Sequence, residues 1–279
     1  MLTIALMGAG GKAGYRVASN LKNNSNYKTY YVEISDSGHE RLAKLGVPVT
    51  PEDKALPYAD AVILAVPDIR VGAICQALIP KLKSGTMVIS LDPAAAYAGV
   101  LPERPDITYF VTHPCHPSVF HDETDPEARM DWFGGVKAKQ SIVCALHRGP
   151  ESDYARCEEI ARAIWAPVTK SYRITVEQMA ILEPGLTETL ATTTLAILRE
   201  GLDEAIRMGV PKEAALDFFF GHIRTGLAIS FGVADFPISA GAKLAVERAK
   251  PRIFRRDWKK VMSIASIKRS VREITGALK

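Results

Sequence analysis

Short apolar runs alternate with amphipathic segments along the first 172 residues. The runs cover residues 3–7, 30–34, 60–66, 87–91 and 107–112, with polar or glycine-rich stretches between them. In the intervening segments, apolar side chains recur at helical spacing. Strands that alternate with helices form βαβ units, whose strands are parallel and covered on both faces. The pattern therefore predicts an α/β domain, built on a doubly wound parallel sheet, in residues 1–172.

The periodicity becomes purely helical in the second part of the chain. Residues 176–208 predict one long helix, broken at most at Pro184–Gly185, and further helices are expected at 211–232, 239–246 and 258–278. We therefore expect residues 173–279 to form an all-helical domain for substrate binding and dimerisation. A helix of that length needs more apolar cover than about 70 further residues give, which favours a homodimer.

Composition narrows the class of protein. With 279 residues, 47% of them hydrophobic, the chain can bury two cores. Its net charge of +4 is mild and mixed in sign, so we expect small anionic ligands and no nucleic acid. No apolar run approaches the ~18 residues of a membrane span. The four cysteines lack zinc-ribbon or disulfide spacing and the start lacks a basic leader, which predicts a cytoplasmic protein with reduced thiols.

A glycine-rich turn follows the first predicted strand and opens the first predicted helix. The spacing Gly8-x-Gly10-x-x-Ala13 matches the dinucleotide-binding fingerprint, in which glycines form the turn and let a pyrophosphate approach the helix start. In this context it predicts a Rossmann-type domain. The expected cofactor contacts are Gly8, Ala9, Gly10, Gly11, Lys12, Ala13 and Glu33.

Glu33 lies at the end of the second predicted strand, about 20 residues beyond the turn. An acidic side chain there accepts hydrogen bonds from the adenosine ribose and repels a 2′-phosphate, so NAD is expected over NADP. The alternative is that the glycines only turn the chain and that Glu33 is a solvated strand end.

Two further stretches lie where predicted strands end. Residues 65–68 (AVPD) and 90–93 (SLDP) fall at the carboxyl edge of the sheet, where ligands bind in such folds. We expect them to form groove walls, although Asp92 could instead cap the helix that follows.

The stretch 111–121, VTHPCHPSVFH, contains three of the six histidines. Imidazoles in a loop above the sheet edge suit a metal ion or a general base, and a packed turn without chemistry is the remaining alternative.

Together, the fingerprint, AVPD, THPCHP (112–117) and ILEPGLTE (181–188) give a resemblance over nearly the whole chain. The chain resembles the β-hydroxyacid dehydrogenases, which include the 6-phosphogluconate and 3-hydroxyisobutyrate dehydrogenases. Within that superfamily it is most similar to the oxidoisomerases, NAD enzymes that oxidise a branched sugar acid and rearrange its carbon skeleton. The resemblance implies NAD as cofactor and a small anionic sugar acid as substrate.

One departure from the dehydrogenases bears on the chemistry. Their long helix carries a Lys-x-x-x-Asn pair, whereas this chain has Glu183 and Thr187 at that place. A slip of one helical turn would put Glu188 or Gln178 there instead. Without the lysine, a divalent metal is expected to polarise the substrate oxygens.

The expected metal ligands are His116 and Glu183, and zinc is favoured because imidazole and carboxylate suit it. His113 is either a third ligand or the base that takes the alcohol proton. His113, His116 and Glu183 are thus the candidate catalytic residues, with acid-base or purely structural roles open for His116. The alternative functions are a simple β-hydroxyacid dehydrogenase and an inactive nucleotide-binding sensor. Basic residues in 243–279 are either a solvated face or contacts to an anionic substrate.

Overall fold

The computed structural model describes residues 1–278. Seven strands within them form one sheet in the order β2-β1-β3-β4-β5-β6-β7. The first five in this order are parallel, β6 is antiparallel to β5, and β7 is parallel to β6. The predicted fold class is confirmed. The strands are β1 (Leu2–Met7), β2 (Tyr27–Val32), β3 (Ala61–Leu64), β4 (Met87–Ser90), β5 (Thr108–Pro114), β6 (Gln140–Arg148) and β7 (Val168–Arg173).

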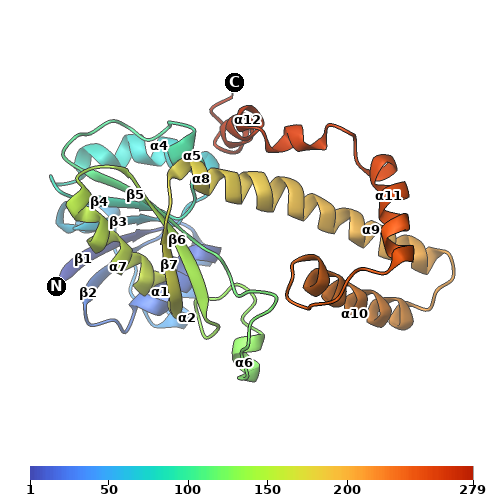
Figure 1. The fold of residues 1–279 in the computed structure, drawn as a ribbon. Coiled ribbons are helices and arrows are strands. Elements are labelled where there is room, and N and C mark those ends of the chain that lie inside the picture. Colours follow the sequence, from blue (N-terminus) through green and yellow to red (C-terminus); the bar gives the residue numbers. More distant parts are fainter. Residues whose placement is uncertain (279) are drawn as a thin grey trace. The chain divides into compact units, whose positions relative to one another are not determined.

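Helices cover both faces of this sheet, with α4 and α5 on one side and α1, α2 and α7 on the other (Figure 1). The helices are α1 (Lys12–Leu21), α2 (Asp36–Leu45), α3 (Glu52–Ala55), α4 (Asp68–Leu78), α5 (Ala94–Tyr97), α6 (Pro126–Arg129), α7 (Tyr154–Ile164) and α8 (Val176–Ala180). Three 3₁₀ turns, η1 (Leu56–Tyr58), η2 (Ile79–Lys81) and η3 (Glu151–Asp153), join some of them.

Strand alternation divides the core between the two faces. In β1, Ile4 and Leu6 point into the cluster shared with α1, α2 and α7, while Ala5 and Met7 join the cluster shared with α4 and α5. The three of these that lie deepest, Ile4, Ala5 and Leu6, are fully buried. Burial on both faces explains why the central strands are continuous apolar runs, which is what made them predictable.

Strands β6 and β7 and helix α7 were not among the predicted elements. Strand β6 runs back along β5, with Thr112 opposite Cys144. Strand β7 is one of the two edge strands, and four of its six residues are exposed. An edge strand with so few apolar positions lacks the hydrophobic run that predicts a buried strand.

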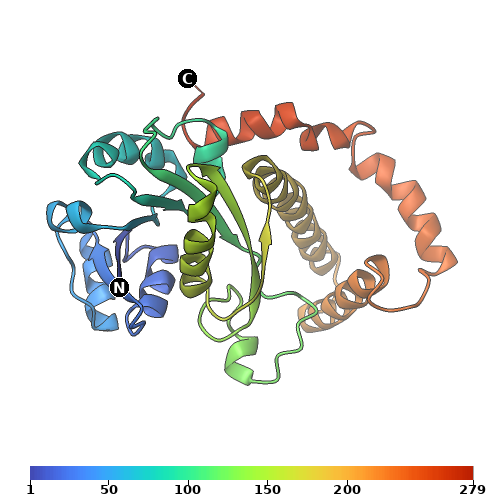
Figure 2. The ribbon, with the colours of Figure 1, turned by 60° about the vertical axis from the view of Figure 1, so that its left-hand side comes forward.

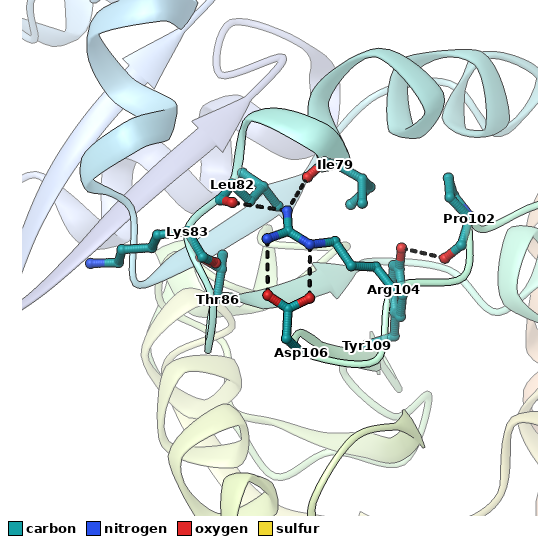
Figure 3. Close-up of polar contacts among 8 residues, drawn as sticks. All are labelled: Ile79, Leu82, Lys83, Thr86, Pro102, Arg104, Asp106 and Tyr109. Atoms are coloured by element: carbon teal, nitrogen blue, oxygen red, sulfur yellow. Dashed lines mark hydrogen bonds and ion pairs between the residues drawn. The ribbon is translucent and has the colours of Figure 1, made fainter.

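A polar cluster around Arg104 lies at the end of the sheet where β4 and β5 begin (Figure 3). The Arg104 guanidinium donates two hydrogen bonds to the Asp106 carboxylate, and its Nη1 also donates to the backbone carbonyls of Ile79 and Leu82. The hydrogen bonds from Arg104 hold the pKa of Asp106 below its usual range. The cluster joins the end of η2 to the loop before β5.

The predicted long helix is present as three consecutive segments. Helix α8 leads into a π-helical stretch, η4 (Ile181–Thr192), and then into α9 (Thr193–Arg207). Pro184 lies inside η4. A proline has no N–H to donate, and in an ordinary α-helix its ring clashes with the carbonyl four residues before it. Such residues are accommodated by the wider π-turn, and π-helical segments often occur at functional sites.

The chain divides into two compact units by contacts. The first holds residues 1–184 and the C-terminal stretch from Ile267, and the second holds residues 185–266. In the second unit, α10 (Lys212–Ser230) contacts α9, and α11 (Ala240–Ile253) and η5 (Trp258–Met262) follow; α12 (Ile264–Ile274) leads back into the first unit. The predicted domain boundary after residue 172 stays a prediction, which limited proteolysis can test.

The second unit buries almost nothing by itself. Of its residues, all of which the structure describes, Gly185, Leu202 and Ala215 are buried. Large apolar side chains are exposed instead, among them Phe218, Phe231 and Phe236, each about 70% exposed. Over residues 1–278, none of the helices combines the length and the apolarity that crossing a membrane requires.

Candidate active site

The glycine turn joins β1 to α1 where β2 and β3 diverge on either side of β1. Gly8 has φ +72°, and a side chain there would collide with the carbonyl oxygen of Ala65. A Cβ on Gly14 would strike the carbonyl of Gly8, so Gly14, rather than Ala13, is the position that lets helix and turn pack closely. Helix α1 begins at Lys12, and its first-turn N–H groups have no acceptor within the helix. This is the geometry that receives a pyrophosphate.

Glu33 is the first residue after β2 and its carboxylate is held in place. Oε2 accepts a hydrogen bond from the Gly10 N–H at 2.8 Å, and Oε1 accepts from the Ile34 and Ser35 N–H groups at 2.8 and 2.9 Å. Partial burial opposes ionisation, but these hydrogen bonds prevail and hold the pKa of Glu33 below its usual value. The alternative of a freely solvated strand end does not describe this carboxylate, because it accepts a hydrogen bond from the glycine turn. The role of Glu33 in cofactor binding stays a prediction.

Two adjoining cavities lie at the carboxyl edge of the sheet, one on each side of the turn. One, of about 420 Å³, is lined by Gly8, Glu33 and Ser35. The other, of about 370 Å³, is lined by Lys12, Asp92 and His113 among others. They share Gly11 and the segment 65–67. An elongated ligand with two halves and a central anionic group fits this arrangement, since the turn's N–H groups lie between the cavities.

His113 is the second-last residue of β5 and faces an acidic cluster. Its Nδ1 lies 2.8 Å from the Leu91 carbonyl oxygen, and because that oxygen can only accept, Nδ1 carries the proton. Nε2 lies 3.5 Å from Oε2 of Glu183. In a neutral imidazole this nitrogen is an acceptor, so two acceptors face each other unless a proton or a cation lies between them.

Two aspartates add negative charge to this cluster. Asp92 Oδ2 is 3.9 Å from His113 Nδ1, while its Oδ1 accepts from the Ala94 N–H at the start of α5. Asp92 therefore lines the cavity, as expected, and also binds the start of that helix, from the position before the N-cap residue Pro93. Burial, the charge of Asp92 and, to a lesser extent, that of Glu183 raise the pKa of Asp68 to about 6. A carboxyl group whose pKa is raised beside a cavity is a mark of functional sites.

His116 lies in the loop between β5 and β6, which extends from the sheet and carries α6 (Figure 2). It is exposed, and its ring meets that of His113 edge to face, with 6.1 Å between centroids. Its Nδ1 is 2.8 Å from the Phe133 carbonyl oxygen and therefore carries the proton. The structure thus brings Glu183 to His113, and the ring of His116 contacts the ring of His113.

Histidine, cysteine, aspartate and glutamate side chains are the usual protein ligands of metal ions. Within the part of the chain that the structure describes, no three of them are arranged to hold an ion. The predicted ligand pair of His116 and Glu183 stays a prediction.

The comparisons with known proteins agree with this geometry. Residues 121–275, more than half of the chain, match the family model of the phosphogluconate dehydrogenase (decarboxylating) C-terminal region. D-apionate oxidoisomerases from Rhizobium rhizogenes and Cupriavidus necator are each 51% identical to the chain, covering 99% and 98% of it and 100% and 99% of their own lengths. A solved semialdehyde dehydrogenase NAD-binding protein from Cupriavidus necator, in complex with calcium and NAD, is 50% identical with a TM-score of 0.95 over 99% of this chain and all of that one.

The fold, the glycine turn and the acidic histidine cluster define a Rossmann-type oxidoreductase with a phosphogluconate dehydrogenase-like helical region. The expected superfamily is thereby confirmed. The chain belongs to the D-apionate oxidoisomerase family.

Sequence reasoning treated Asp68 and Asp92 only as groove walls and did not single out Phe133. The two aspartates follow strands at the carboxyl edge, so their positions were visible, but their nearness to Glu183 depends on α8 and η4 folding over that edge. Phe133 gave no signal, because a lone aromatic residue in a loop has no pattern.

Proposed function

We propose that this protein oxidises D-apionate with NAD and isomerises the product to 3-oxo-isoapionate. The observation that carries the proposal is the position of His113 and Glu183 beside one of two cavities that adjoin at a dinucleotide-type glycine turn. Support comes from the D-apionate oxidoisomerases at 51% identity and from the NAD complex of the Cupriavidus necator protein.

The cavity beside Glu33 would take the adenosine half of NAD, and the cavity beside His113 the nicotinamide half. The bound carboxylate of Glu33 accepts ribose hydroxyls and repels the 2′-phosphate of NADP. The N–H groups at the start of α1 and the cation of Lys12 would face the pyrophosphate.

His113 is the candidate base. With Nδ1–H bonded to the Leu91 carbonyl, Nε2 is the nitrogen that can accept the alcohol proton while the hydride leaves carbon for the nicotinamide. Glu183 faces that nitrogen and would stabilise the imidazolium that forms. His116, with Nε2 as its acceptor, is a second candidate for acid-base work or substrate contact.

A divalent metal fits the donor set, with zinc favoured. Two ligands at about 2.1 Å from a tetrahedral ion lie about 3.4 Å apart, which is close to the 3.5 Å between His113 Nε2 and Glu183 Oε2. Glu183 would hold it with His116, through Nε2, or with His113. If His113 Nε2 is a ligand it cannot also be the base, because this nitrogen has one lone pair. When bound, the ion would polarise the substrate's hydroxyl and carbonyl oxygens. Substrate oxygens would have to complete its coordination.

Turnover tests the function directly. Purified protein with NAD should reduce the cofactor on adding D-apionate and not on adding linear sugar acids. Carbon NMR of the product separates rearrangement from simple oxidation, since the two ketones are isomers of equal mass. An unrearranged ketone would leave a simple β-hydroxyacid dehydrogenase, and NAD binding with no turnover on any sugar acid would leave a sensor.

Chelation tests the metal. A strong chelator should abolish turnover while NAD still quenches the intrinsic fluorescence, and zinc, manganese or magnesium should restore turnover. Elemental analysis of His113→Ala and Glu183→Gln proteins should show reduced metal content. Full turnover in chelator, with no metal by elemental analysis, would leave His113 as a plain general base.

We also propose that the protein is a homodimer formed through residues 185–266. A unit with three buried residues has too little core to fold alone, and its exposed phenylalanines and leucines form the kind of surface that a second copy covers. Light scattering at micromolar concentration should give twice the chain mass. A folded monomer at that concentration would refute the dimer. With free thiols at all four cysteines, we further propose a cytoplasmic location.

A further inference from the structure

The loop between β5 and β6 is held in shape by hydrogen bonds within itself and is bound to α1 by one more. Oδ2 of Asp131 accepts hydrogen bonds from three consecutive N–H groups, those of residues 136–138. From α1, the Asn20 amide donates to the carbonyl oxygen of Gly135 at 2.8 Å. Phe133 lies between these two attachments, and its position is therefore held by contacts that do not involve its own side chain.

The ring of Phe133 makes cation–π contacts with two basic side chains at the start of α1. Lys12 Nζ lies 4.4 Å and the Arg16 guanidinium carbon 4.2 Å from the ring centroid. Lysine and arginine four residues apart on a helix repel each other, and an aromatic face compensates for part of that repulsion. Burial lowers the pKa of Arg16, and the charge of Asp131, which belongs to the same loop as Phe133, opposes the shift.

The backbone of Phe133 holds a residue of the candidate active site. Its carbonyl oxygen accepts from Nδ1 of His116, and the two rings meet edge to face with 5.9 Å between centroids. His116 has φ +60° and is the one non-glycine residue with positive φ within residues 1–278. A side chain in that conformation persists where its surroundings hold it.

Phe133 thus connects the two ends of one cavity. Lys12 and His113 both line the cavity of about 370 Å³, and His116 contacts His113. The chain of contacts runs from Lys12 through Phe133 and His116 to His113. It lies outside the cavity and joins its phosphate end to its histidine end.

We propose that Phe133 is a positioning residue that couples cofactor binding at Lys12 and Arg16 to the orientation of His116 at the substrate end. The proposal rests on the function proposed above. An arriving pyrophosphate neutralises the two cations that the ring holds, and the same ring and carbonyl set the direction of the His116 Nε2 atom. Because coupling between two binding sites is reciprocal, the substrate strengthens cofactor binding by the factor by which cofactor strengthens substrate binding.

Three variants distinguish the effect of the aromatic ring from the effects of side-chain size and of a general change in the loop. Phe133→Leu keeps an apolar side chain and removes the aromatic face, whereas Phe133→Tyr keeps the face. Trp132→Leu is the matched control, because Trp132 is the adjacent aromatic residue, is 68% exposed and has no contact to Lys12 or Arg16 among the ring and cation contacts of the described residues. Melting temperatures identify any variant that fails to fold.

NADH fluorescence gives the dissociation constant of NADH without D-apionate and with saturating D-apionate. The measured quantity is the first constant divided by the second. The parent ratio should exceed one. Phe133→Leu should bring it to one and weaken NADH binding alone about 3- to 10-fold. Phe133→Tyr and Trp132→Leu should keep the parent ratio.

The proposal is overturned if Phe133→Leu keeps the parent ratio, if Trp132→Leu loses it equally, or if the parent ratio is one. Failure of the proposed function is distinguishable, because then the parent protein itself binds no NADH or turns over no D-apionate. A folded Phe133→Leu protein with parent NADH affinity and ratio would make the ring contacts purely structural.

Discussion

Two polar clusters of the first unit, at opposite edges of the same sheet, differ in how their charges are matched. Around Arg104, one cation faces one carboxylate and two carbonyl oxygens, and each acceptor receives a hydrogen bond (Figure 3). Around His113, one imidazole lies among carboxylates, and its Nε2 faces Glu183 at 3.5 Å, which is longer than a hydrogen bond.

This difference indicates that the Arg104 cluster contributes to stability and the His113 cluster to function. The Arg104 cluster lowers the pKa of its carboxyl group, as a matched pair does, whereas near His113 burial and the charges of Asp92 and Glu183 raise the pKa of Asp68. Excess negative charge beside a cavity destabilises the empty site and is relieved by a proton, a cation or a positively charged nicotinamide. We expect substitutions in the two clusters to have opposite consequences for turnover and for unfolding.

The largest effect is expected for Glu183→Gln. The amide keeps the size of the side chain but carries no charge to stabilise an imidazolium at His113, so turnover should fall about 10²- to 10⁴-fold. Steady-state kinetics with NAD and D-apionate measure it, and the melting temperature should stay near that of the parent. Glu188→Gln is the matched control on the same π-helical stretch. A larger loss from Glu188→Gln would mean that the active carboxylate lies one turn further along.

Arg104→Met should have the reverse profile. Removing the guanidinium takes one donor from the Ile79 carbonyl, which keeps the Leu82 N–H, and takes the Arg104 donor from the Leu82 carbonyl. The free energy of unfolding should fall by about 2–3 kcal/mol. Turnover per folded molecule should be unchanged. Urea denaturation measures the change. Lys81→Met, which breaks an exposed pair with Glu52, is the control and should cost about 1 kcal/mol or less. An equal cost for both would show that Arg104 is only a surface charge.

The sequence was most informative where burial or backbone geometry restricts the choice of residue. The central strands are apolar because both faces are covered, and Gly8 is a glycine because its φ is positive. The pairing of His113 with Glu183 was not predictable, since it depends on the π-helical turn that brings residue 183 over the end of β5. The contact of Phe133 with Lys12 joins residues far apart in the chain, and no local pattern encodes it.

Glu33 lies at the same end of the sheet as His113, but its negative charge is compensated, as in the Arg104 cluster, because backbone N–H groups donate to both its oxygens. Glu33→Ala should therefore reduce the preference for NAD over NADP about tenfold and also loosen the glycine turn. Titrating both cofactors by fluorescence measures the preference. Glu40→Ala, at an exposed position of α2, is the control. Equal affinity of the parent protein for the two cofactors would remove Glu33 as the selecting residue.

The smallest effect is expected for Asp68→Asn, and it should depend on pH. The pKa of Asp68 is about 6 in the folded protein and about 3.9 in an unfolded chain. The folded state therefore binds this proton more tightly, and the parent loses stability as the pH rises from about 4 to about 6. Above that range Asp68 is ionised in both states and the full cost remains. Asparagine removes the charge, so it should stabilise the protein by about 1–2 kcal/mol at pH 7.5, once solvent screening of this partly exposed group is allowed for. At pH 4 the difference should be only a small fraction of that, because Asp68 is then protonated in the folded protein and about half protonated in the unfolded chain. Melting curves of both proteins at the two pH values test this, and a shift of equal size at both would mean that Asp68 is not strained by its acidic neighbours.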